Sequence, residues 1–161
     1  MTLPHANPGT VVRDPGMLEI AVAALWRGSG AGIEVLIAQR PRTAIRGGLW
    51  ELPGGKAGPG EPPAEAAARE LAEETGVTVA AEDGVVLGRI EQHDPHLAAE
   101  RSIALTLVAF EAPPGAAPRA IASDACRWEL VERLGDHDWP AANRRLNALL
   151  EGFLVRPTGQ R

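Results

Sequence analysis

The sequence predicts a single α/β domain in which helices cover a β-sheet, and three observations support this prediction. Short apolar runs typical of strands lie on both sides of an amphipathic segment at residues 62–75. A second helical segment is expected at residues 140–150, near the end of the chain. The length of 161 residues fits one domain with one hydrophobic core. Strands, a helix, further strands and a closing helix are the order expected of a layered α/β domain.

Apolar runs bounded by turn residues give the expected strands, and the first two should form a hairpin around the glycine-rich segment 28–32. A basic loop is expected at residues 40–48. Residues 112–118 contain three prolines and one glycine, so we expect an excursion over the surface. The folded domain should span residues 17–155, between a flexible lead-in at 1–16 and a tail at 156–161. The expected strands are residues 18–27, 33–39, 50–52, 77–80, 85–90, 102–110 and 125–131.

The helix expected at residues 62–75 has one apolar side, and residues typical of helix termini lie at both of its ends. Pro62 and Pro63 suit a first turn, where the missing N–H costs little, and Gly76 suits a left-handed C-terminal cap. The apolar stripe should pack against the core. Its members are Ala64, Ala67, Ala68, Leu71 and Thr75.

Three carboxylates share the other side of this helix. Glu70, Glu73 and Glu74 lie at positions i, i+3 and i+4, so their side chains are neighbours and repel one another. A solvated acidic face is the simpler interpretation. The preceding strand, however, ends in a Gly54-Gly55 turn, where backbone carbonyls can approach a bound group closely. Carboxylate and carbonyl oxygens suit Mg²⁺ or Mn²⁺, and such ions hold phosphates, so this pattern indicates metal-assisted phosphate or pyrophosphate cleavage.

Composition narrows the class of protein. The formal net charge of −5 argues against a nucleic-acid polymer or an anionic membrane as the partner, but a bound cation would still attract an anionic nucleotide. Cys126 is the only cysteine, which excludes an intrachain disulfide and is typical of a reducing cytoplasm. We expect no membrane span and no signal peptide, and hence a cytoplasmic protein.

The spacing around the acidic helix resembles a known motif. Gly55, then Glu61, then the segment Arg69-Glu70-Leu71-x-Glu73-Glu74-x-Gly76-Val77 matches the Nudix box at every defined position. Weaker similarity to the MutT-like branch of the Nudix hydrolases extends from about Leu18 to Leu150. The resemblance implies an α/β/α sandwich with a mixed sheet. It also implies hydrolysis of nucleoside diphosphates linked to another group.

The resemblance assigns roles within the box. Glu70, Glu73 and Glu74 would hold divalent cations together with the carbonyl of Gly55, and Glu70 or Glu73 would orient or deprotonate the attacking water. Glu61 and Arg69 would form a structural ion pair. Relatives often recruit another acid from a later loop, and the candidates here are Asp124 and Glu129.

Three residues outside the box are the candidates for substrate binding. Arg40 and Arg101 would neutralise phosphate or cover the base, and Asn143 would recognise the base edge through its amide. The alternatives are a solvated loop arginine, a charge at a strand edge and a residue at a helix start, respectively.

The function expected from the resemblance is hydrolysis of a (d)NTP, with 8-oxo-dGTP as one possible substrate, to a nucleoside monophosphate and pyrophosphate. The alternatives are ADP-ribose or another nucleoside diphosphate derivative, or a nucleotide-binding module without catalysis. The chain has no tyrosine, which argues against the tyrosine stacking of many dinucleoside polyphosphate hydrolases. The partner would be a nucleotide, and the protein a monomer or a homodimer.

Overall fold

The structure, a computed structural model, describes residues 16–93 and 102–155. Arg101, nearly all of the expected lead-in and the expected tail lie outside these residues. Two α-helices are described, α1 (Pro63–Thr75) and α2 (Ala141–Leu154). The strands are β1 (Met17–Arg27), β2 (Glu34–Gln39), β3 (Trp50–Glu51), β4 (Gly54–Lys56), β5 (Val85–His93), β6 (Ser102–Glu111) and β7 (Ala125–Leu130). Short 3₁₀ helices span η1 (Gly30–Gly32), η2 (Ala81–Asp83) and η3 (Val131–Asp136).

The seven strands form one mixed sheet. Its main order is β3-β2-β1-β6-β5, β4 pairs with β1, and β7 pairs with β2. The long central pair β1–β6 is parallel, from Met17 opposite Ser102 to Trp26 opposite Glu111, whereas the other pairs are antiparallel. The run Ser102–Glu111 is buried almost throughout, as expected of a strand covered on both faces.

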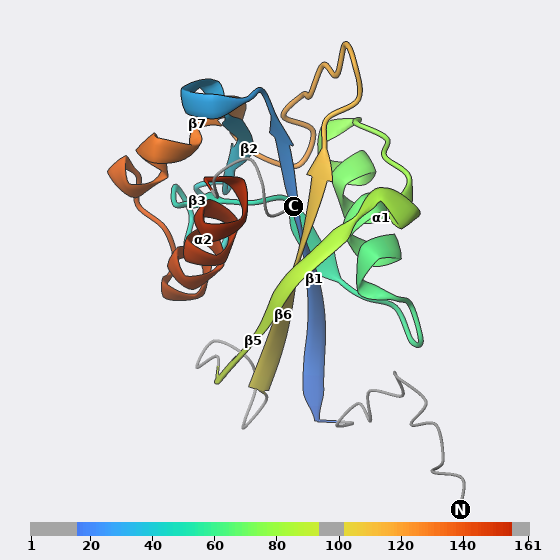
Figure 1. Ribbon diagram of the computed structural model, residues 1–161. Coiled ribbons are helices and arrows are strands. Elements are labelled where there is room, and N and C mark those ends of the chain that lie inside the picture. The colour runs from blue at the N-terminus through green and yellow to red at the C-terminus, as the bar shows by residue number, and fades with distance from the viewer. Residues whose placement is uncertain (1–15, 94–101, 156–161) are drawn as a thin grey trace, which may run out of the picture.

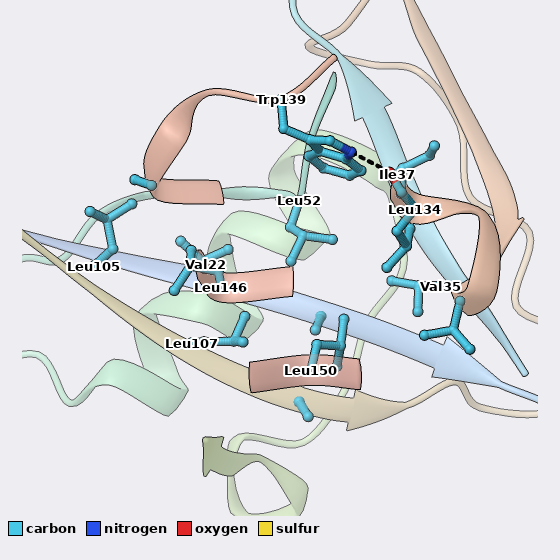
Figure 2. Close-up of a cluster of buried hydrophobic side chains, with 14 of the residues drawn as sticks. Val22, Val35, Ile37, Leu52, Leu105, Leu107, Leu134, Trp139, Leu146 and Leu150 are labelled. Atoms are coloured by element: carbon cyan, nitrogen blue, oxygen red, sulfur yellow. Dashed lines mark hydrogen bonds between the residues drawn. The ribbon is translucent and has the colours of Figure 1, made fainter. Parts of the chain in front are cut away.

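The two helices cover opposite faces of this sheet (Figure 1). On one face, Ala66, Ala67 and Leu71 of α1 pack against alternate residues of β1 such as Ala21 and Ala23. On the other face, α2 packs on Val22, Leu105 and Leu107, and Figure 2 shows this larger core with Leu146 and Leu150 at its centre. The predicted α/β/α sandwich with a mixed sheet is therefore confirmed.

Local sequence patterns misplaced several element boundaries. The strand expected at residues 77–80 is wrong, because this segment is irregular and Val77 only fills the core beneath α1. The expected Gly-Gly turn is instead a short strand, β4, held by β1. The first hairpin is shorter than expected, since β1 and β2 pair only at Trp26–Val35 and Arg27–Glu34. Within the described residues, no helix has both the length and the apolar character needed to cross a membrane.

Candidate active site

The site forms where β1 changes partner. Beyond Trp26–Val35, strand β2 leaves β1 and pairs with β3, and β4 takes its place beside Ala21 and Val22. The backbone N–H of Ala23 donates to the carbonyl of Pro53 at 2.7 Å, which holds the crossing segment against β1. Residues 51–55 therefore cross the gap that opens between β1 and β2, beside the C-terminal half of α1.

Gly55 and Glu70 are in direct contact. Gly55 pairs with Ala21, whose side chain belongs to the core beneath α1, so a side chain at position 55 would point toward α1. A Cβ atom built there would lie only 2.4 Å from the carboxyl carbon of Glu70. Only glycine lets this carboxylate approach the strand backbone, which places a carboxylate beside the peptide of Gly55.

Arg69 is the hub of a hydrogen-bond network among the acidic residues. Its Nε and Nη2 donate to the two oxygens of Glu61 at 2.8 and 3.0 Å, and Nη2 also donates to the carbonyl of Lys56 at 3.0 Å. Its Nη1 donates to Glu70 at 2.9 Å and contacts Glu73 at 3.4 Å. The Arg69 hydrogen bonds and one from the N–H of Gly58 lower the pKa of Glu61 to about 2. This pair joins the loop before α1 to the helix.

Glu74 is a box glutamate whose pKa is strongly raised. Burial, above all, raises its pKa to about 7, although the N–H of Gly54 donates to its Oε2 at 3.3 Å and lowers it. The negative charges of Glu51, Glu70 and Glu73 raise it further. Four carboxylates thus repel one another at one place, which is the electrostatic environment that a divalent cation would relieve.

Glu51 is the member of this group that sequence reasoning missed. It pairs with Ala38, which in turn pairs with Cys126, and this row lies on the α1 side of the sheet. The pKa of Glu51 is raised overall, because the effect of burial is larger than the lowering by Arg40. Arg40 acts through its charge and through a hydrogen bond from Nη1 at 2.7 Å. The available signal was a lone carboxylate between Trp50 and Leu52, in an apolar strand leading into the box.

The donor set fits a hard divalent cation by its chemistry. Glu70 lies beside the backbone of Gly55, Glu74 accepts from the N–H of Gly54, and Glu73 follows on the same side of α1. Carboxylate oxygens of this kind suit Mg²⁺ or Mn²⁺. In the described part of the chain, however, no three His, Cys, Asp or Glu side chains are already gathered as a metal cage. Arg69 engages Glu70 and Glu73 while Gly54 engages Glu74, so these side chains have protein partners in this arrangement.

The two candidate loop acids are not brought to the box. Asp124 is exposed and accepts a hydrogen bond from the N–H of Arg42 at 3.1 Å. Glu129 pairs with Val35, whose side chain lies in the core beneath α2, so Glu129 is on the opposite side of the sheet from Glu74. Its carboxylate contacts His137 instead, at 2.7 Å.

A cavity of about 510 Å³ lies on the α2 side of the sheet and reaches the gap. Arg40 and Asn143 both line it, together with Glu51 and Gly55. Its floor is aliphatic, formed by Leu18, Ile20, Val22, Leu52, Ile103 and Leu105. Asn143 lies in the first turn of α2, but the N-cap position belongs to Pro140. The side chain of Asn143 has no hydrogen-bond partner among the described residues. Gln92, on β5, also lines the cavity and was not expected from the sequence.

The mixed sheet between two helices, with an acidic helix against a Gly-Gly strand, defines an α/β/α sandwich with a candidate site for a cation and a phosphate. The model of the NUDIX domain matches residues 17–150, and the chain belongs to the Nudix family of hydrolases. Members of this family generally use divalent metal cations.

Named relatives and a solved structure are similar to this chain. It is 42% identical over 118 residues to the protein named "Putative 8-oxo-dGTP diphosphatase 2" of Mycobacterium tuberculosis, covering 70% of this chain and 76% of that one. It is 39% identical over 80 residues to the CTP pyrophosphohydrolase of Escherichia coli, covering 46% and 56%. The fold matches the NUDIX domain of Shewanella oneidensis NrtR, described as a complex with ADP ribose, with a TM-score of 0.69 and 20% identity over 89% and 94% of the chains.

Proposed function

We propose that the protein hydrolyses a (d)NTP, with Mg²⁺ or Mn²⁺ as cofactor, to a nucleoside monophosphate and pyrophosphate. The observation that carries this proposal is that the acidic side of α1 adjoins a cavity with an aliphatic floor through the shared residue Gly55. Gly55 contacts Glu70 on one side and lines the cavity on the other. A flat base can lie on the aliphatic floor while its phosphates reach the carboxylates.

The box residues have distinct roles in this proposal. Glu70, Glu73, Glu74 and the carbonyl of Gly55 would hold the cation, which when bound neutralises phosphate charge and lowers the pKa of water. Glu70 or Glu73 would orient or deprotonate the attacking water. Arg69 and Glu61 hold the loop before α1 to the helix through two hydrogen bonds.

The cavity residues would select and orient the nucleotide. Arg40 is held by Glu51 and by the carbonyl of Ile45, at 2.7 and 2.9 Å, so its guanidinium is fixed beside the gap and can meet phosphate. Asn143 lines the cavity, and its amide, without a partner in residues 16–93 and 102–155, can both donate to and accept from a base edge. Arg101 stays a candidate for phosphate or base contact.

Oxidised guanine nucleotides are the favoured substrates, and this rests on the relative named as an 8-oxo-dGTP diphosphatase. The E. coli relative named for CTP and the NrtR domain bound to ADP ribose keep a pyrimidine nucleotide and ADP-ribose as alternatives. A free nucleotide in the cytoplasm would be the partner.

The experiment is a panel of substrates with purified protein. Eight nucleotides, 8-oxo-dGTP and ADP-ribose would be incubated with Mg²⁺, Mn²⁺ or EDTA, and monophosphate and pyrophosphate would be quantified. We expect metal-dependent pyrophosphate release from at least one triphosphate. If ADP-ribose is the only compound cleaved, with release of AMP and ribose phosphate, then ADP-ribose replaces the triphosphate as the proposed substrate. Tight nucleotide binding without any product would favour a non-catalytic module.

Substitution of the box carboxylates tests the assignment of the metal ligands. Glu73→Gln and Glu74→Gln should each lower turnover by at least roughly 100-fold, because each removes a charge from the proposed metal site. Glu82→Gln, at an exposed carboxylate in η2, is the matched control and should leave turnover unchanged. Full turnover of both box variants at saturating Mg²⁺ would contradict the assignment.

A further inference from the structure

Four side chains form a cluster on the α2 side of the sheet, outside the proposed catalytic groups. Nε2 of His137 lies 2.7 Å from Oε2 of Glu129, and Arg127 Nη2 donates to the same oxygen at 3.2 Å. The Arg127 guanidinium lies 4.6 Å above the ring of Trp50, and the Trp50 and His137 rings are 5.4 Å apart. Glu129 and His137 are largely buried, with side chains 14% and 15% exposed. The cluster joins β3, β7 and the segment before α2.

This cluster is connected through neighbouring residues to two residues that line the cavity, Arg40 and Asn143. On one side, Trp50 precedes Glu51, which holds Arg40 at 2.7 Å. On the other side, His137 is followed by Asp138, whose carbonyl accepts a hydrogen bond from the N–H of Trp50 at 2.9 Å. The chain then passes through the buried Trp139 into the first turn of α2, where Asn143 lines the cavity.

The electrostatics of the cluster favour one arrangement of these groups. Burial acts to raise the pKa of Glu129, but hydrogen bonds from His137 and the N–H of Leu130, with the charges of His137 and Arg127, lower it overall. Glu129 is therefore an ionised acceptor, and the proton on Nε2 of His137 faces it. A largely buried pair of this kind contributes little net stability, because desolvation offsets the attraction, so its main effect is on geometry.

We propose that Glu129 and His137 are positioning residues that hold the first turn of α2, and with it Asn143, at a fixed distance from β3. They would set how well the base fits while the phosphates lie at the box, and so act on nucleotide affinity and base preference. This proposal rests on the proposed function, because it assumes that the cavity takes a nucleotide. Glu129 was considered from the sequence as an acid for the box, and its contacts give it this different role.

The test compares Glu129→Ala, Glu129→Gln and His137→Ala with Glu132→Ala. Glu132 is an exposed glutamate of η3, so it controls for loss of a carboxylate from the same part of the chain. We expect Glu129→Ala to raise KM for the best nucleotide roughly tenfold and to reduce base discrimination, with kcat within about twofold. Glu129→Gln keeps an oxygen that accepts from His137, so it should recover part of the affinity. Glu132→Ala should match the wild type.

Hydrogen exchange provides a second readout that does not need catalysis. Amides of residues 137–143 should exchange faster in Glu129→Ala than in Glu132→Ala, while α1 stays unchanged. Unchanged exchange in 137–143 would overturn the proposal, whatever the activity. Faster exchange with unchanged KM and base preference would also overturn it, since the role would then be structural only. If the wild type binds nucleotides without hydrolysis, the proposed function fails, and Kd from calorimetry replaces KM in the same comparison.

Discussion

Gly55 connects the backbone of β4 to the carboxylate of Glu70, and its lack of a side chain is what the site requires. Gly55→Ala would place a methyl group 2.4 Å from the carboxyl carbon of Glu70. Since Glu70 is the flexible partner, we expect it to rotate away, so that kcat/KM falls at least roughly tenfold and half-saturation needs more Mg²⁺. Steady-state kinetics over a Mg²⁺ titration would measure both effects.

Gly152→Ala is the matched control, because Gly152 lies in α2 with open space where its Cβ would be. Alanine is favoured over glycine inside a helix, so this variant should be more stable by about 0.5–1 kcal/mol with normal kinetics. Wild-type Mg²⁺ dependence in Gly55→Ala would show that the close approach of Glu70 has no part in activity.

Glu74 should make the stability of the metal-free protein depend on pH. Its pKa is about 7 in the folded state against an ordinary value of 4.5, so the folded state holds the proton more tightly. Stability is therefore greatest below pH 4.5, falls as the pH rises through 7, and is then constant. Glu74→Gln removes the buried charge, so in EDTA it should be more stable than the wild type at pH 8, by at most roughly 3 kcal/mol. Denaturant unfolding at pH 8 and pH 5 measures this.

At pH 5 the advantage of Glu74→Gln should be mostly lost, because wild-type Glu74 is then largely protonated. Glu82→Gln is the control, since Glu82 is an exposed carboxylate of η2 outside the acidic cluster. An equal gain at both pH values would assign the effect to packing or to helix propensity.

At the scale of single residues, the part of the site that the sequence predicted is the part built from neighbours in the chain. Glu70, Glu73 and Glu74 are fixed by helical spacing, and Gly55 lies only fifteen residues before Glu70. Glu51 was missed because its approach to Glu74 depends on β3 pairing with β2, and no local pattern encodes that contact. Glu129 was a candidate for the box for the same reason, because the sequence alone does not show which face of the sheet a residue of β7 occupies.

Helix α2 contributes its first turn to the wall of the cavity. The buried side of this helix should make the main contribution of α2 to the free energy of unfolding. Leu146 is fully buried at the centre of the core in Figure 2, so Leu146→Ala should cost about 2–5 kcal/mol. Leu149, one turn away and 38% exposed, is the control, and Leu149→Ala should cost less than about 1 kcal/mol. Urea unfolding would give both values, and similar costs would mean that α2 packs with a different face toward the sheet.

Elements with strong periodicity were predicted well, and short ones were not. Residues 102–110 and the acidic helix have long consistent patterns, and both lie where expected. The segment 77–80 has the composition of a strand but finds no partner edge, because it closes the turn after α1. Strand β4 has the glycine content of a turn and is a strand only because β1 supplies hydrogen bonds that β2 leaves free.

The whole molecule places the proposed metal site and the proposed nucleotide cavity on opposite faces of one sheet, and the two meet at the gap between β1 and β3. The box helix lies on one face and the cavity beneath α2 on the other, with residues 51–55 between them. With a net charge of −5, the protein should repel a free triphosphate unless a cation neutralises the cluster. Binding of metal and binding of nucleotide should therefore each strengthen the other.

This coupling can be measured with a (d)NTP analogue that has a methylene group between the α and β phosphates. At about 100 times its Kd with Mg²⁺, the analogue should stabilise the fold by about 2.7 kcal/mol, which for this chain length raises Tm by roughly 5–10 °C. The rise should exceed the sum of those with Mg²⁺ alone and with analogue in EDTA. Glu74→Gln should lose the excess, whereas Asn143→Ala should keep metal coupling and lose base preference. An equal rise in EDTA would show that the nucleotide binds without the acidic cluster, and that the two faces of the sheet act independently.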